Sequence, residues 1–257
     1  MIKHILSFIL FLRIISNDVW AQTSETIQTD RPDQTECPFI VPTHYIQIEN
    51  GFLIENLSEH TTNYAYPSTL WKYGLNERVE LRLITELVSL KNDTVVTSGL
   101  NPITLGFKVS ICQEKGIIPY TSFIGHMTTS NVGTAAFKTP SPAPSFRFTM
   151  QHTVSDKISL SYNLGCKWDG ETAETTYLYT LATGFSLTEK LGMYIELYGF
   201  TPQHSKAEHR FDGGFTYLIT NHLMVDLSGG LGITKNAPKN YLSLGLSYRF
   251  KPQIKNI

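Results

Sequence analysis

The stretch "YLSLGLSYRF", residues 241–250, alternates strictly between two kinds of side chain. Because successive side chains of a β-strand point to opposite faces, such a strand has one apolar face and one face of small or polar groups. It therefore separates an apolar medium from a polar one. The apolar set is Leu242, Leu244, Leu246, Tyr248 and Phe250, and the other set is Ser243, Gly245, Ser247 and Arg249.

The same alternation recurs along the chain between residues 44 and 250. It is clear in the stretches 79–87, 103–111, 146–151, 158–165, 191–199 and 223–232. It is weaker in the stretches 44–53, 68–74, 117–127, 176–187 and 208–218. Together these segments predict about twelve strands.

The connections between these segments alternate in length. The short, charged turns are 75–78, 113–116, 154–157, 188–190 and 220–222. The longer polar connections are 54–67, 88–101, 128–142, 167–175, 201–207 and 233–239. Short turns on one rim and long loops on the other are typical of an up-and-down transmembrane barrel, and an even strand count places both termini on the short-turn, periplasmic side.

A secreted β-sandwich is the alternative, because its strands also alternate, with the apolar face inward. Two features favour the membrane. Many apolar faces end in Tyr or Phe, as an interfacial aromatic girdle requires, and the opposite faces carry Gly, Ser and Thr with single charges. Charged residues make up only 17% of the chain. We predict an all-β fold, an antiparallel transmembrane barrel in the outer membrane of a Gram-negative-type bacterium.

The N-terminus has the features of a secretory signal peptide. Lys3 is followed by the apolar run 5–12, which Arg13 ends far below spanning length, and Val19 and Ala21 occupy the small-residue cleavage positions. We predict a signal peptide over 1–21, a periplasmic leader over 22–43, the barrel over 44–250 and a tail over 251–257.

Three motifs carry a family resemblance. They are "TDRPDQTECP" (29–38) before the strand "HYIQIENGF" (44–52), "PSTLWKYGLNERVELRL" (67–83) and "PITLGFKVSI" (102–111). Together they resemble the phenol-degradation meta-pathway family of outer-membrane, transporter-like β-barrel proteins. The resemblance implies a channel for small hydrophobic or aromatic compounds. The chain departs from the family at Cys37, where a small Ser is common, and in its tail beyond Phe250.

The leader has an unusual concentration of charge between two prolines. Its charged residues are Asp30, Arg31, Asp33 and Glu36. Proline fixes φ and restricts the residue before it, so Pro32 and Pro38 keep this segment extended or turned. We expect it to fold into the lower lumen, where its charges pair with inward charges, since an unpaired buried charge is costly. The alternative is a disordered periplasmic leader.

The polar faces of the strands supply a set of candidate lumen-lining residues of both signs. They are Gln47, Glu49, Glu80, Arg82, Glu86, Lys108, Arg147, Glu196, Asp212, Asp226 and Arg249. Glu49, Arg82 and Arg249 are the partners we expect for the leader. The whole set is compatible with a path for polar solutes and with a salt-bridge network that fills a narrow barrel.

Other chemistry is sparse. With 21 basic and 22 acidic residues the chain has no basic surface for nucleic acid. Cys37, Cys112 and Cys166 show no metal spacing, and we predict no cofactor, metal or catalytic residue. One cluster, His204 and His209 with Glu208 and Asp212, leaves a hydrolase as a distant alternative; no nucleophile motif accompanies it.

We therefore expect a passive transporter or channel, not an enzyme. The alternative from another class is a non-conducting structural barrel whose loops, such as 128–145, bind partners outside the cell. The expected partners are outer-membrane lipid, the barrel assembly machinery and a small-molecule solute.

Overall fold

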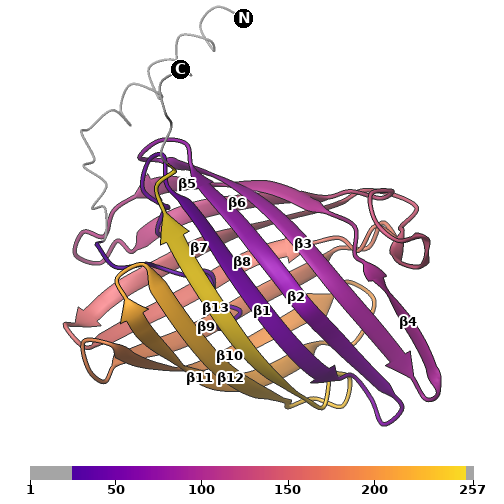
Figure 1. The fold of residues 1–257 in the computed structure, drawn as a ribbon. Helices are drawn as coiled ribbons and strands as arrows, with labels where there is room; N and C mark the ends of the chain where they lie inside the picture. Colours follow the sequence, from indigo (N-terminus) through magenta and orange to yellow (C-terminus); the bar gives the residue numbers. More distant parts are fainter. Residues whose placement is uncertain (1–24, 253–257) are drawn as a thin grey trace, which may run out of the picture.

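A closed antiparallel sheet makes up the protein (Figure 1). The computed structural model describes residues 25–252, so the predicted signal peptide lies outside the described residues, as do positions 253–257 of the predicted tail. The strands are β1 (Ile46–Asn56), β2 (Thr61–Gly74), β3 (Val79–Asn92), β4 (Val95–Leu100), β5 (Thr104–Cys112), β6 (Tyr120–Thr128), β7 (Ala143–Ser155), β8 (Ile158–Lys167), β9 (Thr176–Ser186), β10 (Leu191–Pro202), β11 (Glu208–Thr220), β12 (Leu223–Gly232) and β13 (Asn240–Phe250).

Pairing between the first and last strands closes the barrel. β1 lies antiparallel to β13, from Ile46 opposite Phe250 to Asn56 opposite Asn240. Every strand except β4 pairs with at least two neighbours, and β3 pairs with β2, β4 and β5, so twelve of the 13 strands form the wall. The predicted all-β barrel of about twelve strands is confirmed. In the described part of the chain the only helix is the 3-10 turn η1 (Ala135–Phe137), and no helix there is long and apolar enough to cross a membrane.

β4 is the element that the sequence did not predict. The first half of β3 pairs with β5, whereas its second half, from Leu87 to Asn92, pairs with β4 and forms a hairpin that projects from the wall (Figure 1). The prediction of a loop over 88–101 was wrong. Val95 and Val96 are both largely exposed because β4 has no second neighbour, so this strand lacks the one-sided burial that produces alternation.

Alternation along the strands sorts side chains between two environments. On β13 Ser243 and Ser247 are buried on the lumen side, whereas Leu244 is 55% exposed on the outer side. The same holds around the barrel: large apolar side chains form the exposed outer surface, and charged side chains are buried within. An apolar outside with a polar inside is stable only when lipid covers the outer face.

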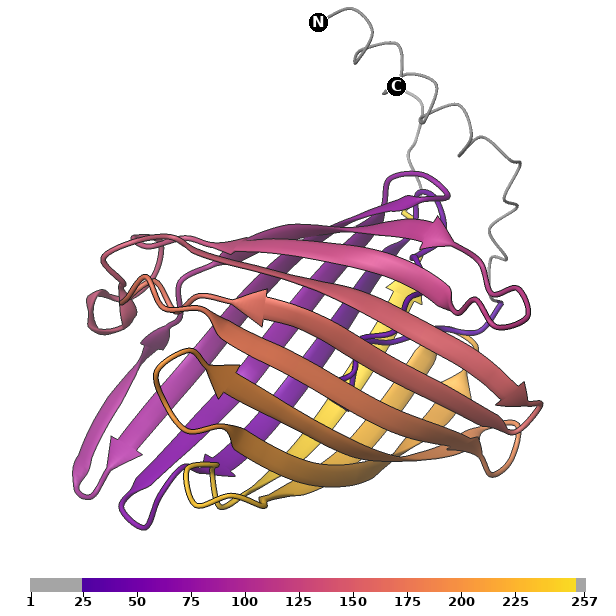
Figure 2. The ribbon, with the colours of Figure 1, turned by 180° about the vertical axis from the view of Figure 1, so that it is seen from behind.

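The chain enters and leaves the wall at the same rim, where Ile46 lies opposite Phe250. The tight connections β2–β3, β7–β8 and β11–β12 lie at that rim, which makes it the periplasmic one by the usual asymmetry of such barrels. The long connection 129–142, which contains η1, lies at the opposite rim (Figure 2).

Leu244 provides a test of the lipid-facing assignment, since it lies mid-strand opposite Phe52 and Leu227. Replacing it by arginine places a charge near the bilayer midplane, and we expect Leu244→Arg to lower the free energy of unfolding in lipid vesicles by about 2–4 kcal/mol. Denaturant unfolding followed by tryptophan fluorescence measures this. Leu244→Ile is the matched control; equal stability of the two variants would contradict the assignment.

Candidate functional site

The leader, residues 25–43, runs through the barrel lumen and contacts the wall on several sides (Figure 2, indigo). It enters beside the β11–β12 turn, where the Ile27 amide donates to the Asn221 carbonyl at 2.8 Å. It leaves beside β3, where the Val41 amide donates to Glu80 Oε2 at 2.9 Å. A segment without regular structure needs such wall contacts, because its backbone groups would otherwise be buried unpaired.

Asp30 is the centre of the leader's ion pairs. Its Oδ2 lies 2.8 Å from Lys72 Nζ and 3.1 Å from Arg82 Nη1, and its Oδ1 lies 2.9 Å from Lys108 Nζ. All four side chains are almost fully buried. Burial alone would raise the pKa of Asp30, but the cations lower it well below its usual range. One carboxylate thus compensates charges from three strands, β2, β3 and β5.

Two further leader charges have wall partners. Glu36 Oε2 lies 2.7 Å from Arg82 Nη2, and its other oxygen lies 3.5 Å from Arg147. Arg31 Nη2 lies 3.0 Å from Asp226 Oδ1 and donates to Ser243 Oγ at 2.8 Å. The leader is therefore held by charges on both sides of the lumen.

Asp33 differs from Asp30, because no basic side chain of the described residues lies within ion-pair distance of it. The neighbouring backbone faces acids instead: the Gln34 amide donates to Glu196 Oε2 at 2.8 Å. Burial and the carboxylates of Glu196 and Asp212 raise the pKa of Asp33 well above its usual range. Two aspartates three residues apart thus lie in opposite electrostatic environments.

The structure places the sequence-predicted lumen residues as follows. Most of them are buried in the barrel: Gln47, Glu49, Glu80, Arg82, Lys108, Glu196, Asp212, Asp226 and Arg249. Arg147 is half-buried beside Glu36, and Glu86 lies toward the outer rim, where it accepts from Ser68 and Asn101.

The pairings expected for the leader occur only in part. Arg82 pairs with Asp30, but Glu49 accepts from the backbone amides of residues 30 and 31 rather than from the Arg31 side chain. Arg249 donates to the Glu25 carbonyl at 2.6 Å, so it meets the leader through the backbone of that residue. The expected cation for Asp33 is absent from the described residues, because the wall beside it is acidic.

Lys72 is the main residue that the sequence reasoning missed. It is 2% exposed and bridges Asp30 and Glu49, at 2.8 and 2.7 Å. The segment around Lys72 alternates weakly, because it contains Pro67 and several aromatic residues. Its inward direction could have been predicted from the hairpin, in which Lys72 lies opposite the inward Arg82. Asn163, which exchanges two hydrogen bonds with the backbone of Glu36, was also missed.

The acid–histidine cluster does not form. Tyr179 and His209 pair on the outer face of the barrel, with 2.8 Å between Tyr179 Oη and His209 Nδ1, whereas Asp212 is buried in the lumen. Residues an odd number apart on one strand point to opposite faces, so these two groups cannot act together. No cluster of metal-ligating side chains occurs within residues 25–252.

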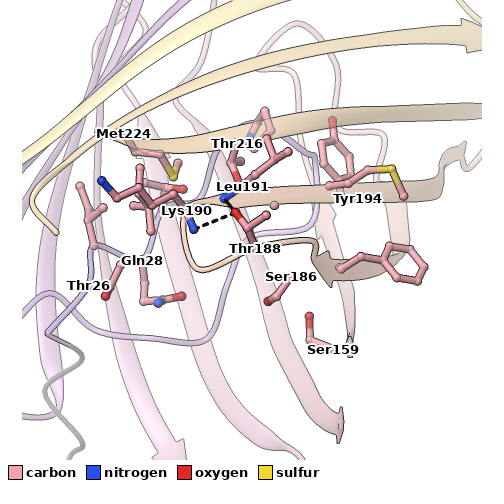
Figure 3. A pocket seen from close by; sticks show the side chains of 18 of the residues that line it. Thr26, Gln28, Ser159, Ser186, Thr188, Lys190, Leu191, Tyr194, Thr216 and Met224 are labelled. Carbon is pink, nitrogen blue, oxygen red and sulfur yellow. Dashed lines mark hydrogen bonds between the residues drawn. The ribbon is translucent and has the colours of Figure 1, made fainter. Parts of the chain in front are cut away.

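A pocket of about 310 Å³ remains between the leader and the wall of β8–β12, at the periplasmic end (Figure 3). Arg31 and Asp33 of the leader form one side of it. Ser159, Tyr194 and Thr216 belong to its wall side. The leader thus leaves part of the lower lumen unfilled.

The family comparison covers most of the leader and the whole barrel wall. Residues 29–250 match the family model described as "Putative MetA-pathway of phenol degradation". The chain belongs to this family. The predicted resemblance is confirmed, and in this phenol-degradation family member the matched region begins within the leader that occupies the lumen.

Solved structures give the same fold at low sequence identity. The COG4313 outer membrane channel from Pseudomonas putida F1 is 13% identical, with a TM-score of 0.64 over 86% of this chain and 99% of that one. The NanC porin is 9% identical, with a TM-score of 0.51 over 79% and 98% of the respective chains. No curated protein matches the sequence. At these identities the likeness establishes the barrel fold that the phenol-degradation family member adopts.

Cys37 reports on whether the leader is docked. Burial raises the pKa of its thiol to about 12, with a further contribution from Asp30, so the reactive thiolate is scarce while the leader is in place. Asp30→Ala leaves three buried cations without their shared partner, and we expect it to weaken docking by roughly 3–5 kcal/mol.

In a Cys112→Ser/Cys166→Ser background, a water-soluble maleimide should therefore label Cys37 much faster in the Asp30→Ala variant than in the parent. Asp33→Asn is the matched control, since its carboxylate has no cation partner in the described chain, and it should not accelerate labelling. Equal rates for the parent and Asp30→Ala would show that the leader is not held by Asp30.

Proposed function

We propose that this protein is a passive outer-membrane channel for small solutes whose leader narrows the lumen. The observation that carries the proposal is the pocket between the leader and β8–β12 at the periplasmic end, since it means that the leader narrows the lumen without filling it. Side chains alone fill the interior of a barrel of about eight strands, whereas a wider barrel of twelve strands leaves space, which the leader here occupies only in part.

Family membership supports small hydrophobic or aromatic molecules as the solute class, since the family is described by a phenol-degradation pathway. The likeness in fold to the COG4313 outer membrane channel is compatible with this role. We further propose that a signal peptide, residues 1–21, directs export and is then cleaved. The barrel assembly machinery inserts the protein into the outer membrane, where lipid surrounds its apolar outer face. Nucleic acid is not among the proposed partners, and catalysis is not part of the proposal.

The non-conducting barrel is the second candidate, and the ion pairs of Asp30 favour it. They connect β2, β3 and β5 across the leader with little exposure to solvent, as a permanent filling would. The two functions differ in what the wild-type barrel does with its leader in place. A channel conducts through the narrowed lumen, whereas a static barrel does not conduct until the leader is removed.

Single-channel recording in planar bilayers tests the proposal. We expect small conductance steps from the mature wild-type barrel and several-fold larger steps from a variant that lacks residues 25–38, because the leader occupies much of the lumen. Heat-modifiable migration in gels is the control that both barrels are folded. A folded wild-type barrel that neither conducts nor admits phenol into liposomes would overturn the channel and favour the structural role.

A further inference from the structure

The buried charges of the lumen are paired on one side and mostly acidic on the other. On the first side, which we call the basic side, buried cations on β2, β3 and β5 are compensated by Asp30 and Glu36 of the leader and by Glu49 and Glu80 of the wall. On the other side, buried acids lie on β10, β11 and β12, namely Glu196, Asp212 and Asp226. Of these three, only Asp226 has a cation among the described residues, the Arg31 side chain.

Glu196 and Asp212 face each other across the β10–β11 pair, and each is 1% exposed. Glu196 accepts from the Gln34 amide and the Thr35 hydroxyl, and Asp212 Oδ2 accepts from the Tyr241 hydroxyl. These donors are neutral, and no basic side chain within the described chain lies in ion-pair range of either carboxyl. With Asp33 beside them, three acids share this side of the lumen.

Buried polar groups without partners converge on the same place. They are Asp212 Oδ1, the Tyr194 hydroxyl and Ser228 Oγ, on the adjacent strands β10, β11 and β12. Tyr194 is 6% exposed and Ser228 is 2% exposed. Orphaned polar atoms at this depth are uncommon in native proteins and call for a ligand, an ion or water.

Gly214 brings these groups together. A Cβ atom there would lie 2.7 Å from Tyr194 Cε1 and 2.9 Å from Ser228 Cβ, so the absence of a side chain allows the tyrosine ring to lie against the wall. Tyr194 also lines the pocket of Figure 3, as does Asp33. The pocket therefore borders the acidic cluster at Asp33 and Tyr194.

We propose that this pocket binds a small organic cation, a primary ammonium ion on an apolar body. The neighbouring carboxyl groups of Glu196 and Asp212 repel each other when both are ionised, and an ammonium ion supplies three N–H donors and the positive charge that lets both ionise. Ile27 of the leader, Met224 and the ring of Tyr194 line the lumen side of the pocket and suit an apolar body. A metal ion fits less well, since the described residues hold no cluster with metal-ligand geometry. The inference rests on the proposed function, because it names a solute class for the same path.

Benzylammonium is a suitable probe, with benzyl alcohol and benzoate as the neutral and anionic controls of similar shape. Isothermal titration of the full mature barrel in detergent at neutral pH should show benzylammonium binding at least about tenfold tighter than either control. Equal binding of benzylammonium and benzyl alcohol would overturn the proposal, and this comparison needs no variant.

Asp212→Asn tests the assigned carboxylate, and we expect it to weaken benzylammonium binding by about tenfold without affecting benzyl alcohol. Asp156→Asn is the matched control, because Asp156 is exposed in the β7–β8 turn and does not line the pocket, so this variant should keep the affinity. Unchanged binding in Asp212→Asn, or an equal loss in Asp156→Asn, would contradict the site. Labelling of Cys37 checks that the leader stays docked in both variants.

The binding experiment and the bilayer experiment fail independently. If the barrel binds benzylammonium but never conducts, the proposed cation site stands and the proposed channel is wrong. If it conducts but does not distinguish benzylammonium from benzyl alcohol, the channel stands and the cation site is wrong.

Discussion

A buried charge must be compensated where it lies, and this constraint organises the molecule. Lipid requires the apolar side chains of every strand to point outward, and the pleat then directs the alternate positions into the lumen. Those positions include Lys72, Arg82 and Lys108, which converge on one side. Asp30 compensates all three, so the leader belongs to the interior of the fold as much as the strands do.

The leader does not compensate the lumen evenly. Its anionic Asp30 and Glu36 meet the basic side and its cationic Arg31 meets Asp226, but Asp33 lies among acids. An arrangement designed only for stability would place a cation near Glu196 and Asp212. No described basic side chain pairs with these two acids, although an unfilled pocket lies beside them. Such locally unfavourable arrangements are typical of functional sites.

Much of the fold was predictable, because consecutive residues of a strand point alternately to its two faces. The alternation of 241–250, repeated along the chain, gave the barrel and its approximate strand count, and loop lengths gave the position of the termini. The same reasoning failed at β4, since a strand with one neighbour has no buried face to mark it. It also missed Lys72, whose inward direction follows from its register with β3 rather than from its own stretch.

The sequence by itself determined that this chain is an outward-apolar barrel with inward charges, because side-chain direction in a strand depends only on position parity. Only the tertiary structure decided which charges meet. Closure of the sheet brings β5 and β12 within reach of one short leader, and the sequence distances involved, such as Asp30 to Lys108 or Arg31 to Asp226, carry no local signal. For the same reason the sequence could predict that His209 and Asp212 point to opposite faces of their strand. It could not predict that Tyr194, Asp212 and Ser228 lie close together.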